Sequence, residues 1–288
     1  MSLKHSLLSA AYLPLRMGNN LLRRVGVKLD ARVRIINYHD IATNEQEKFA
    51  AQLRWLARSW TFVSPQRFAA MISGEEPIKG SNLLLTFDDG FASNRRVAEE
   101  VLKPMGIQAL FFVVPDFVNF REEDYRTYIT SHFYPNMNPE RVPECGPNMT
   151  WNDLAWLIEN GHTIGNHTRT HALLSELKQE NELQEEIVES ADELERNLGV
   201  KIEHFAFPFG NLGSFSPAAL ALARHRFPFI YTGLRGDNTD KADKWAIRRD
   251  VIQTYDSLGL VGALLEGGAD FHYAKSLAKY KSWGKEIS

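Results

Sequence analysis

Short runs of apolar residues alternate with amphipathic stretches along most of the chain after residue 31. The apolar runs have the length and composition of strands, and they are residues 33–38, 83–87, 109–114, 204–207, 229–232 and 245–247. Apolar positions with helical spacing occur in residues 49–60, 94–105, 150–161 and 179–198. This repeated alternation of strand and helix predicts an α/β fold built on a parallel sheet.

The most regular helical pattern covers residues 179–198. Its apolar positions step by four, four, three and four residues, and Gly199 follows as a helix stop. These positions are Leu183, Ile187, Ala191, Leu194 and Leu198. The many glutamates between them are expected on a solvated outer face.

Residues 115–149 interrupt the alternation. The segment holds several aromatic residues and five prolines, at positions 115, 135, 139, 143 and 147. Because loops of this length are usually functional or disordered, we interpret the segment as an insertion near a site.

The composition excludes several classes of protein. With 288 residues, 44% hydrophobic and 24% charged, the chain is able to bury a sizeable core, so it is not disordered, collagen-like or disulfide-stapled. The net charge is −3, which gives no global attraction to nucleic acid. Cys145 is the single cysteine; it excludes an internal disulfide and is expected to be a buried or loop thiol.

The first 29 residues contain five basic residues and no acidic one, with leucines between them. Such a segment suits peripheral contact of residues 1–28 with an anionic membrane surface. The alternative is a helix that covers one end of the fold. No apolar run reaches the roughly 18 residues needed to span a bilayer, and no secretory signal is evident, so a cytoplasmic location is expected, with or without membrane association. The basic residues of 273–288 are expected in a solvated tail.

One candidate for chemistry is the end of an apolar run, where Asp88, Asp89 and Gly90 follow Thr86 and Phe87. In parallel α/β folds the carboxyl ends of the strands form the active face. Asp-Asp-Gly is also a common turn sequence, so this motif alone leaves both interpretations open.

A second candidate is the pair His167 and His171. Histidines four residues apart fall on one face of a helical turn and can chelate one ion, although such pairs often make only ordinary hydrogen bonds. A carboxylate from another strand end, such as Asp89, would complete a three-ligand site with open positions, and Asp88 would stay free as a base. Paired histidines favour a softer divalent metal than magnesium, most simply zinc.

In these motifs the chain resembles the polysaccharide deacetylase family, also called the NodB-homology family. The resemblance runs from about Ile35 to Val251 and rests on three motifs in order, at residues 86–90, 160–171 and 205–210. It implies a distorted (β/α) barrel and metal-dependent removal of acetyl from an N-acetylated sugar. It also implies that Asp88 is the general base and that Asp89, His167 and His171 bind the metal.

Two positions depart from the family pattern. The arginine that orients the base in many members is replaced by Ala206, and Arg248 resembles the arginine that substitutes for it in some branches, although Arg249 is an equal candidate. The Leu-x-His motif that supplies the general acid is missing near the carboxyl end. His39 ends the first strand, which neighbours the last strand in a closed barrel, so we expect His39 to take that place.

The sequence therefore predicts a metal-dependent sugar N-deacetylase with Asp88, His39 and Arg248 as catalytic residues. Substrate contacts are expected from Phe207, Pro208, Phe209 and Gly210, the rings of which could equally be packing residues. The alternatives are an O-deacetylase, a non-catalytic sugar-binding protein and, less favoured, magnesium-dependent phosphoryl transfer. Because the motifs must converge on one metal, we expect one barrel over residues 31–272, with segment 1–30, insertion 115–149 and tail 273–288 attached.

Overall fold

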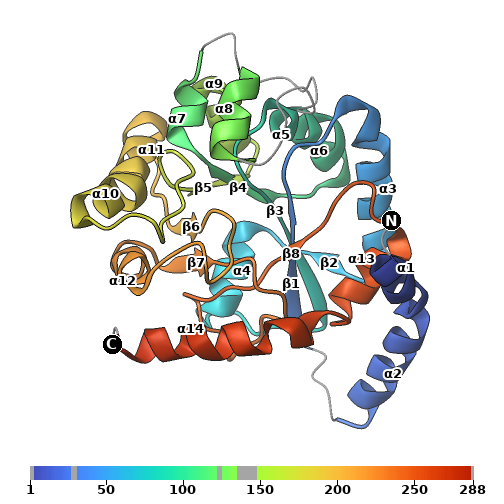
Figure 1. The fold of residues 1–288 in the computed structure, drawn as a ribbon. Coiled ribbons are helices and arrows are strands. Elements are labelled where there is room, and N and C mark those ends of the chain that lie inside the picture. Colours follow the sequence, from blue (N-terminus) through green and yellow to red (C-terminus); the bar gives the residue numbers. More distant parts are fainter. Residues whose placement is uncertain (1–2, 27–30, 122–124, 135–147, 287–288) are drawn as a thin grey trace.

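Parallel strands curl into a half-barrel that is surrounded by helices (Figure 1). The computed structural model describes residues 3–26, 31–121, 125–134 and 148–286. The strands are β1 (Arg32–Tyr38), β2 (Thr61–Phe62), β3 (Ser81–Phe87), β4 (Ala109–Val113), β5 (Thr163–Asn166), β6 (His204–Ala206), β7 (Phe229–Tyr231) and β8 (Asp250–Val251). Their order is β7-β6-β5-β4-β3-β1-β8, with β2 beside β3. The distorted (β/α) barrel expected from the sequence is confirmed.

Helices follow most strands, and most of them cover the outside of the sheet (Figure 1). They are α1 (Leu3–Ala10), α2 (Tyr12–Arg24), α3 (Gln46–Leu56), α4 (Pro65–Ile72), α5 (Ala92–Val97), α6 (Lys103–Met105), α7 (Pro115–Asn119), α8 (Tyr125–His132), α9 (Trp151–Glu159), α10 (Glu180–Gln184), α11 (Ser190–Leu198), α12 (Pro217–Arg226), α13 (Leu258–Leu265) and α14 (Ala274–Glu286). Short 3₁₀ turns are η1 (Thr43–Glu45) and η5 (Asp270–Tyr273), and π-helical turns are η2 (Ala98–Leu102) and η4 (Glu185–Glu189).

The two ends of the curled sheet meet at one bridge. Tyr231 of β7 pairs in parallel with Ile247, in the segment that leads into β8. The Ile247 amide donates to Ile230 O at 2.9 Å, and the Thr232 amide donates to Ile247 O at 2.8 Å. The predicted strand 245–247 is therefore wrong in its extent, because only this bridge forms there and β8 begins at Asp250.

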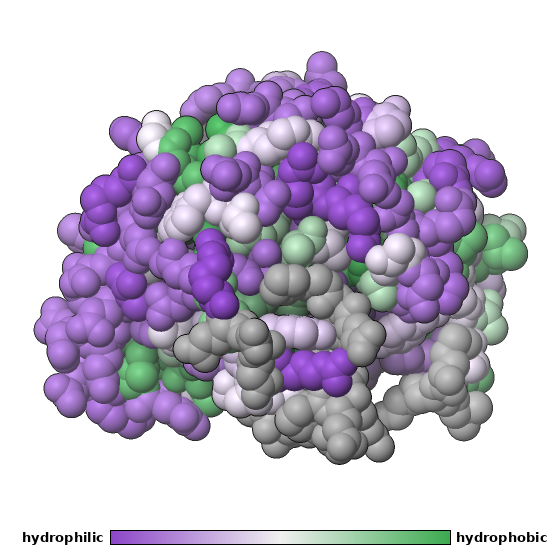
Figure 2. Space-filling model, turned by 90° about the horizontal axis from the view of Figure 1, so that it is seen from above, coloured by the Kyte–Doolittle hydropathy of each residue, from purple (hydrophilic) through white to green (hydrophobic). Residues whose placement is uncertain are grey.

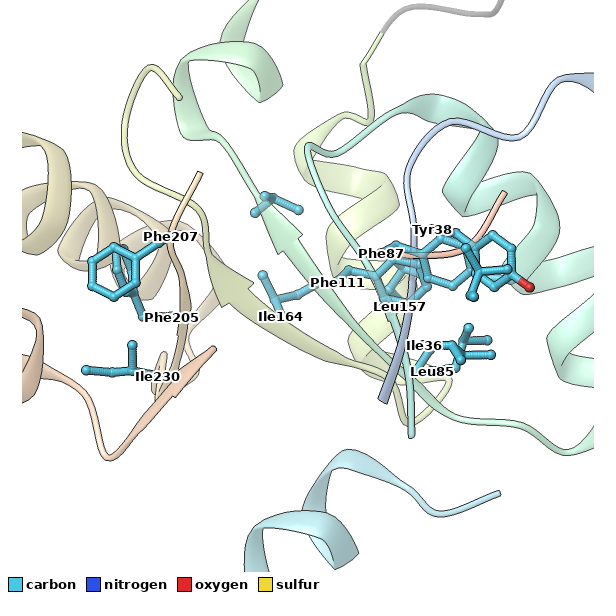
Figure 3. Close-up of a cluster of buried hydrophobic side chains, with 14 of the residues drawn as sticks. Ile36, Tyr38, Leu85, Phe87, Phe111, Leu157, Ile164, Phe205, Phe207 and Ile230 are labelled. Carbon is cyan, nitrogen blue, oxygen red and sulfur yellow. The ribbon is translucent and has the colours of Figure 1, made fainter. Parts of the chain in front are cut away.

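Strand alternation sorts the buried side chains into two layers. One cluster fills the barrel interior and includes Val33, Ile35, Leu84, Leu110, Phe112, Tyr231 and Ile247, with Phe68 and Met71 from α4. The other lies between the strands and the outer helices; among its members are Ile36, Tyr38, Leu85, Phe87, Phe111, Ile164, Phe205 and Ile230 (Figure 3). Along β1, odd-numbered residues face the interior and even-numbered residues face outward.

A buried ion-pair cluster lies on the outward side of β1. Arg34 is fully buried, and its guanidinium lies 2.7 Å from Asp237, 3.2 Å from Asp250 and 2.5 Å from Asp270. Arg32 pairs with Glu266 at 3.2 Å in the same layer. Each cation therefore has carboxylate partners although it is removed from water.

The segments attached to the barrel pack against it to different extents. Helices α1 and α2 lie beside α13 at the outer edge of the molecule, and α14 runs across the barrel with Tyr280 buried (Figure 1). Within segment 115–149 the structure describes residues 115–121, with α7, residues 125–134, with α8, and residues 148–149, whereas Cys145 and the prolines at 135, 139, 143 and 147 lie outside the described residues. No described helix combines the length and apolar character needed to cross a bilayer.

Candidate active site

The turn after β3 directs two adjacent carboxylates to the barrel interior. Asp88 continues the inward series of Leu84 and Thr86, and its amide donates to Tyr38 O at 3.0 Å. Asp89 then adopts a left-handed conformation with φ 77°, and Gly90 follows with φ 98°. This turn is costly for a residue other than glycine, and it keeps the Asp89 carboxylate beside that of Asp88.

Asp88 is held by two donors from other segments of the barrel. The Arg249 guanidinium donates to Asp88 Oδ1 at 2.7 Å, and Asn37 Nδ2 donates to Asp88 Oδ2 at 2.9 Å. Burial alone would raise the pKa of this carboxyl, but the charges of Arg249 and His167 hold the pKa well below its usual range. Asp88 is therefore a fixed carboxylate.

The arginine beside Asp88 is Arg249, whereas the sequence favoured Arg248. Ile247 lies in the interior cluster, so alternation also turns Arg249 inward and Arg248 away. The Arg248 guanidinium instead donates to Asp237 O at 3.2 Å. Ala206, which stands where many family members have arginine, is buried in the same interior cluster. Arg249 thus reaches Asp88 from the segment just before β8.

His167 and His171 follow β5 in a loop, and not on the helical turn that their spacing suggested. Left-handed φ angles of 64° at Thr168 and 66° at His171 exclude a helix there. His167 Nδ1 donates to Ala206 O at 2.7 Å, and His171 Nδ1 donates to His132 O at 2.8 Å. Because a carbonyl oxygen only accepts, each ring leaves Nε2 as an unprotonated ligand atom when neutral.

The two Nε2 atoms and Asp89 Oδ1 form a candidate metal centre. The Nε2 atoms of His167 and His171 lie 3.6 and 3.5 Å from Asp89 Oδ1, and all three atoms lie within 4.8 Å of one another. Asp89 Oδ1 is buried and has no hydrogen-bond partner among the residues that the structure describes. Burial raises the pKa of Asp89 well above its usual range and lowers that of His167 to about 4. Two imidazole nitrogens and one carboxylate oxygen form a donor set that suits zinc.

Glu186 supports the loop that carries the histidines, a role that the sequence analysis missed. Its carboxylate accepts from the Thr170 amide at 3.0 Å and from Thr170 Oγ1 at 2.7 Å, and its carbonyl accepts from the Arg169 amide at 3.1 Å. The side chain is buried, contrary to the expected solvated face. Glu186 lies three residues after Leu183 and four before buried Ser190, which places it at the flank of the helix's core-facing side.

These groups surround a cavity of about 200 Å³ that His39 and Val251 also line. Burial lowers the pKa of His39, although Asp88 partly opposes the shift. Of the expected substrate contacts, Phe209 is 44% exposed and lies 4.8 Å from the His171 ring, whereas Phe207 is fully buried and stacks on Phe215.

The rest of the cavity wall is close-packed. Gly210 lines the cavity and packs so tightly that a Cβ there would meet Gly233 N at 2.4 Å, and Pro208 is buried outside the lining. Phe133, from the described part of the insertion, packs 4.7 Å from the His171 ring.

Seen from the side of α7, α8 and α9, the surface is mostly hydrophilic (Figure 2).

The curled parallel sheet with its surrounding helices matches the NodB-type (β/α) barrel of solved deacetylase structures. A family model described as polysaccharide deacetylase matches residues 76–226. The chain belongs to the polysaccharide deacetylase family.

Solved structures support the fold. IcaB from Ammonifex degensii superposes with a TM-score of 0.63 at 23% identity, covering 82% of this chain and 97% of that one. A de-N-acetylase from Aggregatibacter actinomycetemcomitans gives 0.63 at 16% identity, covering 81% and 99%. The Streptococcus pyogenes deacetylase PplD, in complex with acetate, gives 0.61 at 20% identity, covering 81% and 97%.

One curated relative aligns in part. The Bacillus subtilis protein named "Putative polysaccharide deacetylase YxkH" is 28% identical over 90 residues, which are 29% of this chain and 32% of the relative. The chain thus matches about a third of that relative's length.

Proposed function

We propose that this chain is a metal-dependent hydrolase that removes acetyl from an N-acetylated sugar in a polysaccharide or glycan precursor. The observation that carries the proposal is the buried set of Asp89, His167 and His171 beside Asp88 in one cavity. Three protein ligands with open positions are the arrangement of a catalytic zinc site. Asp89 Oδ1 and the two Nε2 atoms would hold the metal.

A bound divalent metal would supply Lewis-acid polarisation of the acetyl carbonyl and a lowered pKa for water. Asp88, held ionised by Arg249, would take the proton from the attacking water. His39 lines the same cavity and would pass a proton to the departing nitrogen. Since burial lowers the pKa of His39, the proton that it passes on would be the one that Asp88 takes from the water.

Arg249 would act as a positioning residue for Asp88, in the place predicted for Arg248. The exposed ring of Phe209, beside His171, would contact the sugar. Phe207 would contribute through packing, because its ring is buried against Phe215.

Acetate release from N-acetylated oligosaccharides, with zinc and after chelation, tests the proposal. We expect metal-dependent release that falls at least about a hundredfold in Asp88→Asn and His167→Ala, because each change removes a base or a ligand. The exposed Asp240 provides a control, Asp240→Asn, which should keep full activity. Unchanged release in the two site variants would refute the assignment, and faster release from O-acetylated than from N-acetylated sugars would favour the O-deacetylase.

We also propose that residues 1–28 contact a membrane surface. Polar side chains of α2 face the protein: Asn19 donates to Glu266 at 2.8 Å, and Arg23 pairs with Glu266 at 3.0 Å. The opposite stripe is apolar and exposed; Leu13, Met17, Leu21 and Val25 are 62–72% exposed. An amphipathic helix with its apolar side outward and no acidic residue suits an anionic bilayer surface.

Sedimentation with anionic vesicles tests this contact. We expect the variant Leu13→Gln/Met17→Gln/Leu21→Gln to lose binding, whereas Ala51→Gln on the exposed side of α3 keeps it. Equal binding of both variants, or a dimer of the unaltered chain that the triple variant converts to a monomer, would contradict the proposal. A cytoplasmic location stays a prediction.

A further inference from the structure

A second cavity, of about 780 Å³, adjoins the catalytic cavity. Val251, which follows Arg249 and Asp250 in the sequence, lines both cavities. The catalytic cavity, at about 200 Å³, is smaller than the roughly 300–1,000 Å³ typical of small-molecule sites, whereas the second lies within that range. Most of a substrate whose acetyl group is at Asp88 therefore lies outside the catalytic cavity.

The walls of the second cavity are largely apolar. Leu7 and Leu8 of α1 form one side, Leu260 and Leu264 of α13 another, and Phe271 of η5 a third. We call this space the apolar cavity. Arg235 and Asp256 also line it, but Arg235 is already paired with Asp250 at 3.1 Å. The surface offered to a ligand is thus mainly hydrocarbon.

Hydrogen bonds hold the walls of the apolar cavity in place. Gln52 is buried, and its amide donates to Gln253 O at 3.0 Å and Asp256 O at 2.9 Å, which fixes the loop after β8. Ser9 Oγ lies 2.9 Å from Ser257 Oγ, which ties α1 to the start of α13. The cavity is therefore pre-formed and does not depend on a ligand for its shape.

Large apolar side chains at the rim of the apolar cavity face water. Leu7 is 64% exposed, and Tyr255 and Phe271 are each 69% exposed. Exposed apolar groups gathered around one cavity are typical of a surface that meets an apolar partner. The rim adjoins α1, which leads directly into the outward apolar stripe of α2. An apolar chain that enters here is thus also close to the proposed membrane contact.

We propose that the apolar cavity binds the hydrocarbon chain of a lipid-linked sugar whose N-acetylated end occupies the catalytic cavity. The inference rests on the proposed function, since it names the substrate class of the same site. Because both cavities are lined by Val251 and so lie side by side, one ligand that reaches into both is favoured. A polysaccharide substrate without an apolar chain would not explain why large apolar side chains are exposed at the rim of the apolar cavity.

Calorimetric binding of matched glycosides to the metal-free full chain tests the inference without turnover. The probes are methyl, decyl and citronellyl glycosides of N-acetylglucosamine, used below micelle formation. Each buried methylene contributes about a fourfold factor. We therefore expect decyl or citronellyl glycoside to bind at least about thirtyfold more tightly than methyl, which requires burial of only two or three methylenes. The better of the two chains indicates an acyl or a prenyl carrier, and both results support the inference.

Two variants locate the chain. Ala269→Trp fills the apolar cavity, and Phe271→Ser removes an exposed rim residue with little risk to folding. Both should reduce the chain-length advantage to about threefold or less, whereas the control Ala51→Trp on α3 should preserve it. Equal affinity for the methyl and long-chain glycosides in the unaltered chain would overturn the inference. So would a chain-length advantage that both cavity variants retain, or rim burial in a dimer that Phe271→Ser dissociates.

Acetate release separates the two proposals. If oligosaccharides are deacetylated but no glycoside shows a chain-length advantage, the inference fails and the proposed function stands. If the long-chain glycosides bind in the apolar cavity but no acetylated substrate releases acetate, the proposed function fails and the substrate assignment fails with it.

Discussion

Two clusters of buried charge lie on opposite sides of β1 and differ in how their polar atoms are paired. On the outward side, Arg34 reaches three carboxylates at 2.5–3.2 Å. On the interior side, Asp89 Oδ1 has no hydrogen-bond partner within the described part of the chain, and the Nε2 atoms of His167 and His171 lie 3.5–3.6 Å from it. The charged groups of the ion-pair cluster pair with one another, whereas the interior cluster leaves donor atoms that could bind a metal.

Backbone strain separates the same two clusters. In the described chain, the four residues other than glycine with left-handed φ are Asp89, Thr168, His171 and Phe209. All four belong to the candidate site or its loop, and none to the ion-pair cluster. Burial of charge is therefore a poor marker of function by itself, whereas at the candidate site an unpaired carboxylate oxygen and a strained backbone occur together.

The largest effect that tests this contrast is expected from Asp89→Asn. Loss of the carboxylate ligand should reduce metal-loaded deacetylation by about 10⁴-fold, roughly 5 kcal/mol in activation free energy. The free energy of unfolding of the metal-free variant should stay the same or rise, because Asn tolerates the left-handed φ of 77° and carries no buried charge. Urea denaturation and acetate release measure both quantities. Retained activity would show that the Asp89 carboxylate is not a required ligand. A loss of more than about 2 kcal/mol in the free energy of unfolding would show that Asp89 is structural.

Arg34→Met should have the opposite consequence. The substitution leaves Asp250 buried with Arg235 as its remaining cation, so we expect unfolding to become easier by about 3–5 kcal/mol. Activity per folded molecule should stay within about twofold. The control Arg54→Met breaks the exposed Arg54–Glu47 pair and should cost no more than about 0.5 kcal/mol.

A second substitution distinguishes charge from packing at Arg34. Asp250→Asn in the Arg34→Met background removes the orphaned carboxylate and should recover part of the loss in urea denaturation. If the double variant is less stable than the single one, the cost of Arg34→Met comes from packing and not from unpaired charge.

Metal addition should stabilise only through the interior cluster. Zinc at about a hundred times its dissociation constant should raise the free energy of unfolding by about 2.7 kcal/mol. The gain should persist in Arg34→Met and disappear in His171→Gln, which removes one ligand. Thermal unfolding with zinc and with chelator measures it. An equal gain in His171→Gln would place the metal elsewhere.

Much of the fold and of the site follows from local sequence pattern. The apolar runs predict most strands, and the motifs around Asp88 and His167 lie at strand ends because parallel strands share one carboxyl edge. The helix of residues 179–198 is present, although π-helical turn η4 interrupts it. Local pattern suffices wherever the deciding interactions are close in the chain.

The choice between Arg248 and Arg249 depends on information from distant residues. β8 has two residues, and its phase is set by pairing with β1, where Ile36 lies opposite Asp250. Partners of Arg34 lie more than 200 residues further along the chain, so the ion-pair cluster leaves no local signal. Arg32 and Arg34 look like solvated positions of a strand until α13 and η5 cover them.

The smallest expected effect concerns Glu186, which links the outer helices to the interior cluster. Glu186→Gln keeps one acceptor oxygen and loses one of the two bonds to Thr170, so kcat/KM should fall about five- to tenfold, or about 1 kcal/mol. Zinc affinity should fall about tenfold as well, since the loop orients His171; a purely structural role would leave that affinity unchanged. Glu189→Gln, on the exposed side of the same helix, is the matched control. If both variants behave alike in zinc titration and acetate release, Glu186 does not position the histidines, and the interior cluster is independent of the helices that surround it.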